Sequence, residues 1–221
     1  PFWFYTAHRQ HAGHMMKKDT MKKGRMLPVM EHFYTLQGEG CHSGRAAYFI
    51  RIGGCDVGCH WCDVKESWDA SRHPLTDIDT VVAQIPPIVN TVVVTGGEPL
   101  NWNMDYLTSL LHAKGIKTHL ETSGSSPLSG NWDWICLSPK KAKHPLEEVL
   151  IAADELKVIV FNRTDFDWAE KHSKKVKDGC ALLLQPEWSR RHEAMDMITE
   201  YIKSHPKWRA SLQSHKYMNI P

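Results

Sequence analysis

The run C-D-V-G-C-H-W-C places Cys55, Cys59 and Cys62 within one eight-residue stretch of the chain. Three thiolates in one short loop can close on a single metal centre, and cysteine thiolates hold iron–sulfur clusters. A four-iron cluster has four corners, so three protein ligands leave one iron open to a substrate or cosubstrate. The C-x3-C-x2-C spacing therefore indicates catalytic chemistry more than structural bracing.

On spacing alone, the cysteine run is also compatible with other kinds of site. His60 could join the three cysteines in a structural Cys3His zinc site, because short C-x(2–4)-C spacings are common in such sites. Zinc sites usually pair two separated knuckles, however, and the sequence has no second C-x-x-C. A disulfide framework is not expected in 221 residues in which we recognise no signal peptide. Chance clustering of the six cysteines is a further alternative.

A second motif follows a predicted buried strand, where residues 92–99 read V-V-V-T-G-G-E-P. Glycine lets backbone groups approach a ligand closely, and Glu98 can accept a hydrogen bond from an ammonium group. Similar polar motifs follow later predicted strands, namely E-T-S-G at 121–124, S-P-K at 138–140 and L-Q-P at 184–186. Because function gathers at the carboxyl ends of barrel strands, one pocket could collect all of these motifs.

Strand and helix patterns alternate along most of the chain. The predicted strands are Tyr48–Ile52, Thr91–Thr95, Lys117–Glu121, Trp134–Leu137, Leu156–Phe161, Leu182–Leu184 and Trp208–Leu212. One predicted helix begins at a capping box at Thr76–Asp79 and runs toward Ile85. A second carries the apolar stripe Met104, Leu107, Leu110 and Leu111 and ends at Gly115. Further helices are predicted at about 145–153, at about 165–175 and from near Ser189. Repeated β–α units imply a parallel sheet, but the chain is short for a full eight-unit barrel. We therefore expect an α/β fold, an open partial (β/α) barrel with a mostly parallel sheet.

The composition is typical of a globular enzyme, with 42% hydrophobic residues, 24% charged residues and a formal net charge of +2. This small charge gives no reason to expect a nucleic acid or a membrane as a partner. Residues 1–15 are expected to be a vector-derived tag, 16–29 a basic N-terminal arm and 30–221 a single domain. Free cysteines in a cluster motif predict a reducing, cytoplasmic compartment.

The cysteine run and G-G-E-P together resemble the radical S-adenosyl-L-methionine (SAM) superfamily. From about Met30 onward the chain resembles one of its families, the 7-carboxy-7-deazaguanine synthases. The matching segments are F-Y-T-L-Q-G-E-G (33–40), A-Y-F-I-R-I-G-G-C (47–55), W-C-D-V-K-E-S-W (61–68), T-G-G-E-P (95–99), L-E-T-S-G (120–124), L-S-P-K (137–140), L-Q-P (184–186) and S-H-K-Y-M-N-I-P (214–221).

This resemblance implies a carbon–nitrogen lyase that contracts the ring of 6-carboxy-5,6,7,8-tetrahydropterin to give 7-carboxy-7-deazaguanine and ammonia. The reaction is an early step toward queuosine and related 7-deazapurines. The implied cofactors are one 4Fe-4S cluster, held by the three cysteines, and SAM. The implied partners are the pterin substrate and a reducing electron donor such as a flavodoxin, and the chain could form a homodimer.

The resemblance also assigns site residues, none of them as a catalytic acid or base. The residues implied to bind SAM are Trp61, Gly97, Glu98, Ser123, Ser138, Pro139, Lys140 and Gln185. Those implied to bind the substrate are Leu36, Gln37, Gly38, Arg51, Thr95 and Pro221, the last through a terminal carboxylate. A guanidinium fork suits a carboxylate, so Arg51 is expected to pair with the substrate carboxylate. Cys41, Cys136 and Cys180 are expected to be structural.

One position departs from the family pattern. Family members commonly carry Thr two residues after the last cluster cysteine, as a magnesium ligand, whereas this chain has Val64 there. Valine offers no oxygen to a cation that prefers oxygen donors. Magnesium could still bind through substrate and water with help from Asp63, or Lys65 or another cation could replace it.

Two alternative functions can be distinguished from the sequence. A radical SAM activase acting on a protein partner would share the cluster motif, but it gives no reason for Arg51 or for the H-K-Y-M-N-I-P terminus. A non-enzymatic zinc-binding module predicts a colourless protein with one zinc ion and no affinity for SAM.

Overall fold

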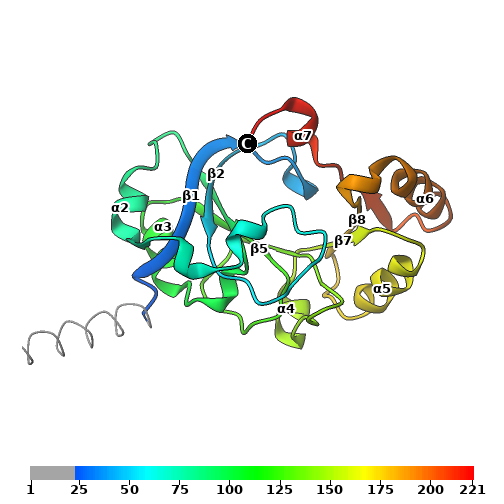
Figure 1. The fold of residues 1–221 in the computed structure, drawn as a ribbon, viewed down its shortest axis with the longest axis horizontal. Coiled ribbons are helices and arrows are strands. Elements are labelled where there is room, and N and C mark those ends of the chain that lie inside the picture. The colour runs from blue at the N-terminus through cyan, green and yellow to red at the C-terminus, as the bar shows by residue number, and fades with distance from the viewer. Residues whose placement is uncertain (1–22) are drawn as a thin grey trace, which may run out of the picture.

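The computed structural model describes residues 23–221, so the expected tag and residues 16–22 of the expected arm lie outside the described residues. One sheet organises the described chain, with nine strands in the order β3-β1-β2-β4-β5-β6-β7-β8-β9. The six pairs from β2 to β9 are all parallel, and only β1 pairs antiparallel, with β2 and β3. The expected open α/β barrel with a mostly parallel sheet is confirmed (Figure 1).

The predicted strands all form, with small changes at their ends. The strands are β1 (Met26–Leu36), β2 (Ala46–Ile52), β3 (Leu75–Asp77), β4 (Thr91–Gly96), β5 (Lys117–Thr122), β6 (Trp134–Leu137), β7 (Glu155–Val160), β8 (Ala181–Pro186) and β9 (Trp208–Ala210). Strands β1 and β3 were not predicted. Because β1 begins at Met26 and buries Leu27 and Val29, the sheet starts inside the segment expected to be a basic arm.

The helices are α2 (Ile78–Ala83), α3 (Asp105–Ala113), α4 (Glu147–Ala152), α5 (Thr164–Ser173), α6 (Arg191–Ser204) and α7 (Ser214–Met218). Within residues 23–221, five short 3-10 helices lie in the loops, at Gly40–His42, Lys65–Ser67, Ala70–Arg72, Pro99–Asn101 and Trp188–Arg190. Helix α7 was not predicted. The capping box was placed wrongly, because Thr76 belongs to β3 and the Asp77 side chain caps α2 by accepting from the Asp79 N–H.

The core lies between the sheet and its helices (Figure 1). Strand β2 illustrates how the sequence sorts its side chains: Ile50 and Ile52 are fully buried in the helix-covered core, whereas Phe49 and Arg51 alternate with them and face the inside of the barrel. This period of two is that of a pleated strand. Burying each large aliphatic side chain contributes roughly 1.5–3 kcal/mol to stability. Burial of Ile50 and Ile52 beneath the helices therefore orients the strand so that Phe49 and Arg51 face the inside of the barrel.

The parallel order of the strands brings their carboxyl ends to one side of the sheet. There β2 leads into the cysteine loop, β4 into Gly97 and Glu98, β5 into Ser123, β6 into Ser138 and β8 into Glu187. The chain end returns to the same side, so that Pro221 and the end of β1 line one cavity (Figure 1). No helix in residues 23–221 is both long enough and apolar enough to cross a membrane.

Candidate active site

Two adjoining cavities lie at the carboxyl ends of the strands. The first, here called the cysteine cavity, has a volume of about 250 Å³ and is lined by Cys55, Cys59 and Cys62. The second, here called the arginine cavity, has a volume of about 310 Å³ and contains Arg51. The two cavities share five wall residues: Glu39, Asp63, Val64, Glu121 and Gln213. Ligands in the two cavities would therefore meet across this shared wall.

The cysteine loop is folded by its own backbone. The Cys62 N–H donates to the Cys59 carbonyl (3.1 Å), and the Cys55 N–H donates to the Trp68 carbonyl (3.1 Å). All three thiols are free and partly exposed. Burial raises the pKa of both Cys55 and Cys59, so these thiols stay protonated unless a metal centre draws off their protons.

The donor set fits an iron–sulfur cluster. Three thiols on one loop line one cavity, and each ligand of a four-iron cluster binds a different iron. Among residues 23–221, no three His, Cys, Asp or Glu side chains are placed to hold a single metal ion.

A fourth cysteine, Cys136, also lines the cysteine cavity, which its expected structural role did not anticipate. It lies on β6, and its thiol donates to Glu155 Oε1 at 3.4 Å. Burial raises the pKa of this thiol well above its ordinary value. Cys136 is therefore a neutral hydrogen-bond donor in the wall, which agrees with a structural role.

Gly97 brings the end of β4 against the cysteine loop. A Cβ atom at this position would lie 2.5 Å from the Gly54 carbonyl oxygen, so only glycine fits. The Gly97 N–H donates to the Ile52 carbonyl (2.8 Å), and the Glu98 N–H donates to the Gly54 carbonyl (2.9 Å). The glycine motif thus holds the cysteine loop at the edge of the cavity.

Glu98 has a different position from the one its motif suggested. Its side chain is 1% exposed and lies outside the lining of both cavities. The carboxylate accepts hydrogen bonds from Thr122 Oγ1 (2.6 Å), from the Ser123 N–H (2.8 Å) and hydroxyl, and from the Leu100 N–H (3.1 Å). Glu98 therefore joins the ends of β4 and β5, and its contact with an ammonium group stays a prediction.

Six of the eight residues predicted to bind SAM line the cysteine cavity: Trp61, Gly97, Ser123, Ser138, Lys140 and Gln185. Glu98 and Pro139 do not line it. Lys140 Nζ donates to the carbonyl (2.8 Å) and hydroxyl (2.6 Å) of Ser138, so the S-P-K turn is closed by its own lysine. Burial lowers the pKa of Lys140, as expected for a cation held inside a cavity wall.

All six residues predicted to bind the substrate line the arginine cavity: Leu36, Gln37, Gly38, Arg51, Thr95 and Pro221. Arg51 Nε lies 2.7 Å from Glu31 Oε1 on the neighbouring strand, an ion pair without hydrogen-bond alignment. Gln37 and Thr95 both donate to the carboxylate of Glu121, each at 2.9 Å. The predicted residues therefore lie in one cavity, and two of them bind Glu121, an acid that was not among the predicted site residues.

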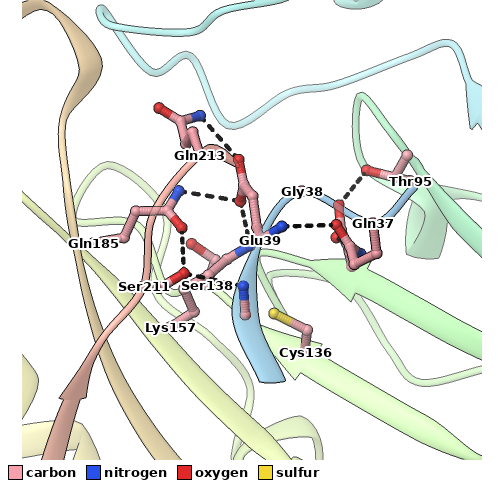
Figure 2. A network of polar contacts seen from close by, with 12 residues as sticks. Gln37, Gly38, Glu39, Thr95, Cys136, Ser138, Lys157, Gln185, Ser211 and Gln213 are labelled. Carbon is pink, nitrogen blue, oxygen red and sulfur yellow. Dashed lines mark hydrogen bonds and ion pairs between the residues drawn. The ribbon is translucent and has the colours of Figure 1, made fainter. Parts of the chain in front are cut away.

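A charged network that joins the half-buried Glu39 to the buried Lys157 was not predicted from the sequence (Figure 2). The Glu39 carboxylate forms an ion pair with Lys157 and accepts from Gln185 Nε2 (3.0 Å) and Gln213 Nε2 (2.9 Å). Burial would raise the pKa of Glu39, but the Lys157 ammonium and the hydrogen bonds lower it to about 2. Glu39 lies inside the motif T-L-Q-G-E-G, so its place in that motif was the signal that could have identified it.

The wall between the cavities also contains Val64 and its neighbours. Val64 lines both cavities, and its carbonyl accepts from the Ser67 hydroxyl at 2.6 Å. Asp63 Oδ2 accepts from Lys216 Nζ (2.5 Å) and from Gln213 Nε2 (3.3 Å). Lys65, which we considered as a replacement cation, is exposed and lines neither cavity.

Comparison with known proteins gives a consistent result. The model of the radical SAM superfamily matches residues 49–159. A 7-carboxy-7-deazaguanine synthase of Flavobacterium psychrophilum is 57% identical over 91% of this chain and 96% of its own length. A protein of the same name from Synechocystis sp. is 47% identical over 87% of this chain and 93% of its own length. A crystal structure of QueE from Escherichia coli superposes with a TM-score of 0.79 at 30% identity, covering 88% of this chain and 97% of that one.

Proposed function

We propose that this chain, which belongs to the 7-carboxy-7-deazaguanine synthase family of the radical SAM superfamily, converts 6-carboxy-5,6,7,8-tetrahydropterin to 7-carboxy-7-deazaguanine with loss of ammonia. The observation that carries the proposal is the pair of adjoining cavities, one with three free thiols and one with Arg51. The family assignment replaces both the zinc-binding module and the activase as interpretations of the cysteine run.

The cysteine cavity is the proposed site of the cluster and SAM. Cys55, Cys59 and Cys62 would hold a 4Fe-4S cluster, which when bound supplies the electron for reductive cleavage of SAM. Lys140 and Ser138 offer polar groups from the end of β6, and the backbone of Gly97 offers a close approach from β4. Trp61 stacks on Phe161 with the ring centroids 5.9 Å apart, which fixes an aromatic wall beside the thiols.

The arginine cavity is the proposed site of the pterin. Arg51 is the partner for the substrate carboxylate, because a guanidinium binds a carboxylate with two parallel hydrogen bonds. The carboxylates of Glu39 and Glu121 are fixed by neighbouring amide and hydroxyl donors and by Lys157, so they can accept from N–H groups of the pterin without moving. Such fixed acceptors orient the substrate toward the shared wall, where it would meet SAM.

A magnesium ion does not fit the residues at the expected position. Val64 has no side-chain oxygen, and the neighbouring carboxylate of Asp63 is already paired with Lys216.

The cellular setting is part of the same proposal. Loss of ammonia and ring contraction would place the enzyme early in the synthesis of queuosine and related 7-deazapurines, in the cytoplasm. A low-potential donor such as a flavodoxin would supply electrons, and a homodimer is compatible with this function. The reduced cysteines support a reducing compartment.

An anaerobic turnover assay tests the proposed function. The cluster-loaded protein is incubated with SAM, a strong reductant and 6-carboxy-5,6,7,8-tetrahydropterin, and products are identified by mass spectrometry. We expect 7-carboxy-7-deazaguanine and ammonia in equal amounts, with neither formed when the reductant or SAM is omitted. Cleavage of SAM without any deazapurine product would contradict the assigned substrate.

A further inference from the structure

We propose that Lys216 supplies the cation that binds the substrate carboxylate together with Arg51, so that substrate binding needs no divalent metal ion. The inference rests on the proposed function, because it concerns the carboxylate of the same pterin. Its starting point is the disagreement between the magnesium ligand expected at position 64 and the valine found there.

The position of Lys216 follows from the short helix α7. This helix lies next to the chain end and brings Lys216 into the lining of the arginine cavity. Lys216 Nζ donates to Asp63 Oδ2 at 2.5 Å, directly beside Val64 in the chain. The ammonium group therefore binds the shared wall residue next to position 64, the position at which the family pattern would put a metal ligand.

Three neighbours fix the lysine side chain. Besides Asp63, Nζ donates to Gln213 Oε1 at 3.2 Å and lies 4.7 Å from the centroid of the Trp188 ring. The side chain is only 20% exposed, although lysine usually extends into solvent. An ammonium group has three donors, and these two hydrogen bonds use two of them. One N–H thus stays available to a ligand in the cavity.

The charges of the arginine cavity suit this role. Glu39, Asp63 and Glu121 are acids in its lining, and Arg51 and Lys216 are cations of the same lining. Lys216 pairs with Asp63, whereas Arg51 pairs with Glu31 outside the lining. An anionic substrate needs cationic partners to offset these carboxylates. A divalent ion beside Val64 would have to displace Lys216 from Asp63, whereas the lysine is already held there.

Binding of two unreactive pterins tests the assignment without relying on turnover. Pterin-6-carboxylate and pterin differ only in the carboxylate, and their dissociation constants are measured by anaerobic equilibrium dialysis with cluster-loaded, SAM-bound protein. Each is measured in metal-depleted buffer and again with millimolar magnesium. The proteins are wild type, Lys216→Met, which keeps the aliphatic stem, Lys216→Arg, which keeps the charge, and Lys203→Met, a control on the exposed face of α6.

We expect wild type to prefer pterin-6-carboxylate equally with and without magnesium. Lys216→Met should reduce this preference by about tenfold, the scale of one hydrogen bond to a charged group, while its affinity for pterin is unchanged. Lys216→Arg should retain part of the preference, and Lys203→Met all of it.

Two results would overturn the assignment while leaving the proposed function standing: a carboxylate preference in wild type that appears only with magnesium, or an equal loss of affinity for both pterins in Lys216→Met. Failure of wild type to bind either pterin would overturn the proposed function and this inference together.

Discussion

Single residues of the cysteine cavity carry the most direct consequences. Cys55, Cys59 and Cys62 share one loop, whereas Cys41 contacts Arg209 and the partly buried Cys180 borders β8. Cys136 is the one further thiol of the same cavity, and its hydrogen bond to Glu155 holds it in the wall. The three loop cysteines are therefore not interchangeable with the others.

Replacing Cys59 by alanine should abolish both the bound iron and turnover. The cluster then keeps two protein ligands, and Cys136 is a neutral thiol that does not lie on the loop. Iron content, visible absorbance and product formation measure the effect, with Cys180→Ala as the matched control that retains all three. Normal iron content in Cys59→Ala would mean that the cluster is held elsewhere.

Replacing Arg51 by alanine should weaken substrate binding by about 1.5–3 kcal/mol, the usual scale for a hydrogen bond to a charged group. Affinity for SAM should not change, because Arg51 lines the arginine cavity and not the cysteine cavity. Calorimetric titration with each ligand measures both affinities, and the exposed Arg45→Ala is the control. A loss of SAM affinity without a loss of pterin affinity would show that Arg51 serves the other cavity.

The sequence predicted most of the residues that line the two cavities, but it did not predict the ion pair between Lys157 and Glu39. Motif residues such as Gln37, Thr95 and Ser138 could be assigned because their motifs resemble those of the family, and they do line the cavities. Lys157 lies within a run that reads as a buried strand, and nothing in its local pattern indicates that Glu39, more than a hundred residues earlier, neutralises it. Such long-range pairing is decided by the fold, because burying either charge alone is costly.

At the scale of elements, the hydrogen bonds of Glu98 to Thr122 and Ser123 form a joint between the ends of β4 and β5 at the edge of the cysteine cavity. Glu98 follows β4, and its carboxylate accepts from the backbone and hydroxyl groups at the end of β5 and just beyond it. Each of these groups donates its hydrogen, so the joint requires two acceptor oxygens.

Replacing Glu98 by glutamine should lower the free energy of unfolding by about 1–3 kcal/mol, because the new amide NH2 would face donors and leave one of them buried without an acceptor. Chemical denaturation followed by circular dichroism measures the change. The control is Glu200→Gln, which removes an exposed ion pair with Lys203 on α6 and should change the free energy of unfolding by less than about 1 kcal/mol. Equal stability of the two variants would mean that the joint tolerates the amide.

Elements with a strong local signal were predicted, and elements held by distant contacts were not. Strand β4 is a run of β-branched residues and was recognised from its composition. Strand β1 includes the stretch E-H-F-Y-T, in which polar and aromatic residues do not alternate regularly, and it is specified by antiparallel pairing with β2. Helix α7 has only five residues, too few for a helical period.

At the scale of the whole molecule, the sheet order explains how short motifs scattered over the chain form one site. Parallel strands present their carboxyl ends together, and the antiparallel β1 adds the segment from Leu36 to Glu39 at the same cavity. The two cavities share a wall for this reason. We propose that SAM in one cavity reacts with the pterin in the other across that wall.

The most direct test of this claim is transfer of a label between the two ligands. The family resemblance implies that a 5′-deoxyadenosyl radical formed from SAM takes hydrogen from C6 of the pterin. Substrate carrying deuterium at C6 is turned over anaerobically, and the 5′-deoxyadenosine formed from SAM is analysed by mass spectrometry. We predict that the deuterium appears in 5′-deoxyadenosine in step with the formation of 7-carboxy-7-deazaguanine. Unlabelled 5′-deoxyadenosine accompanying full product formation would contradict direct contact between the two ligands at the shared wall.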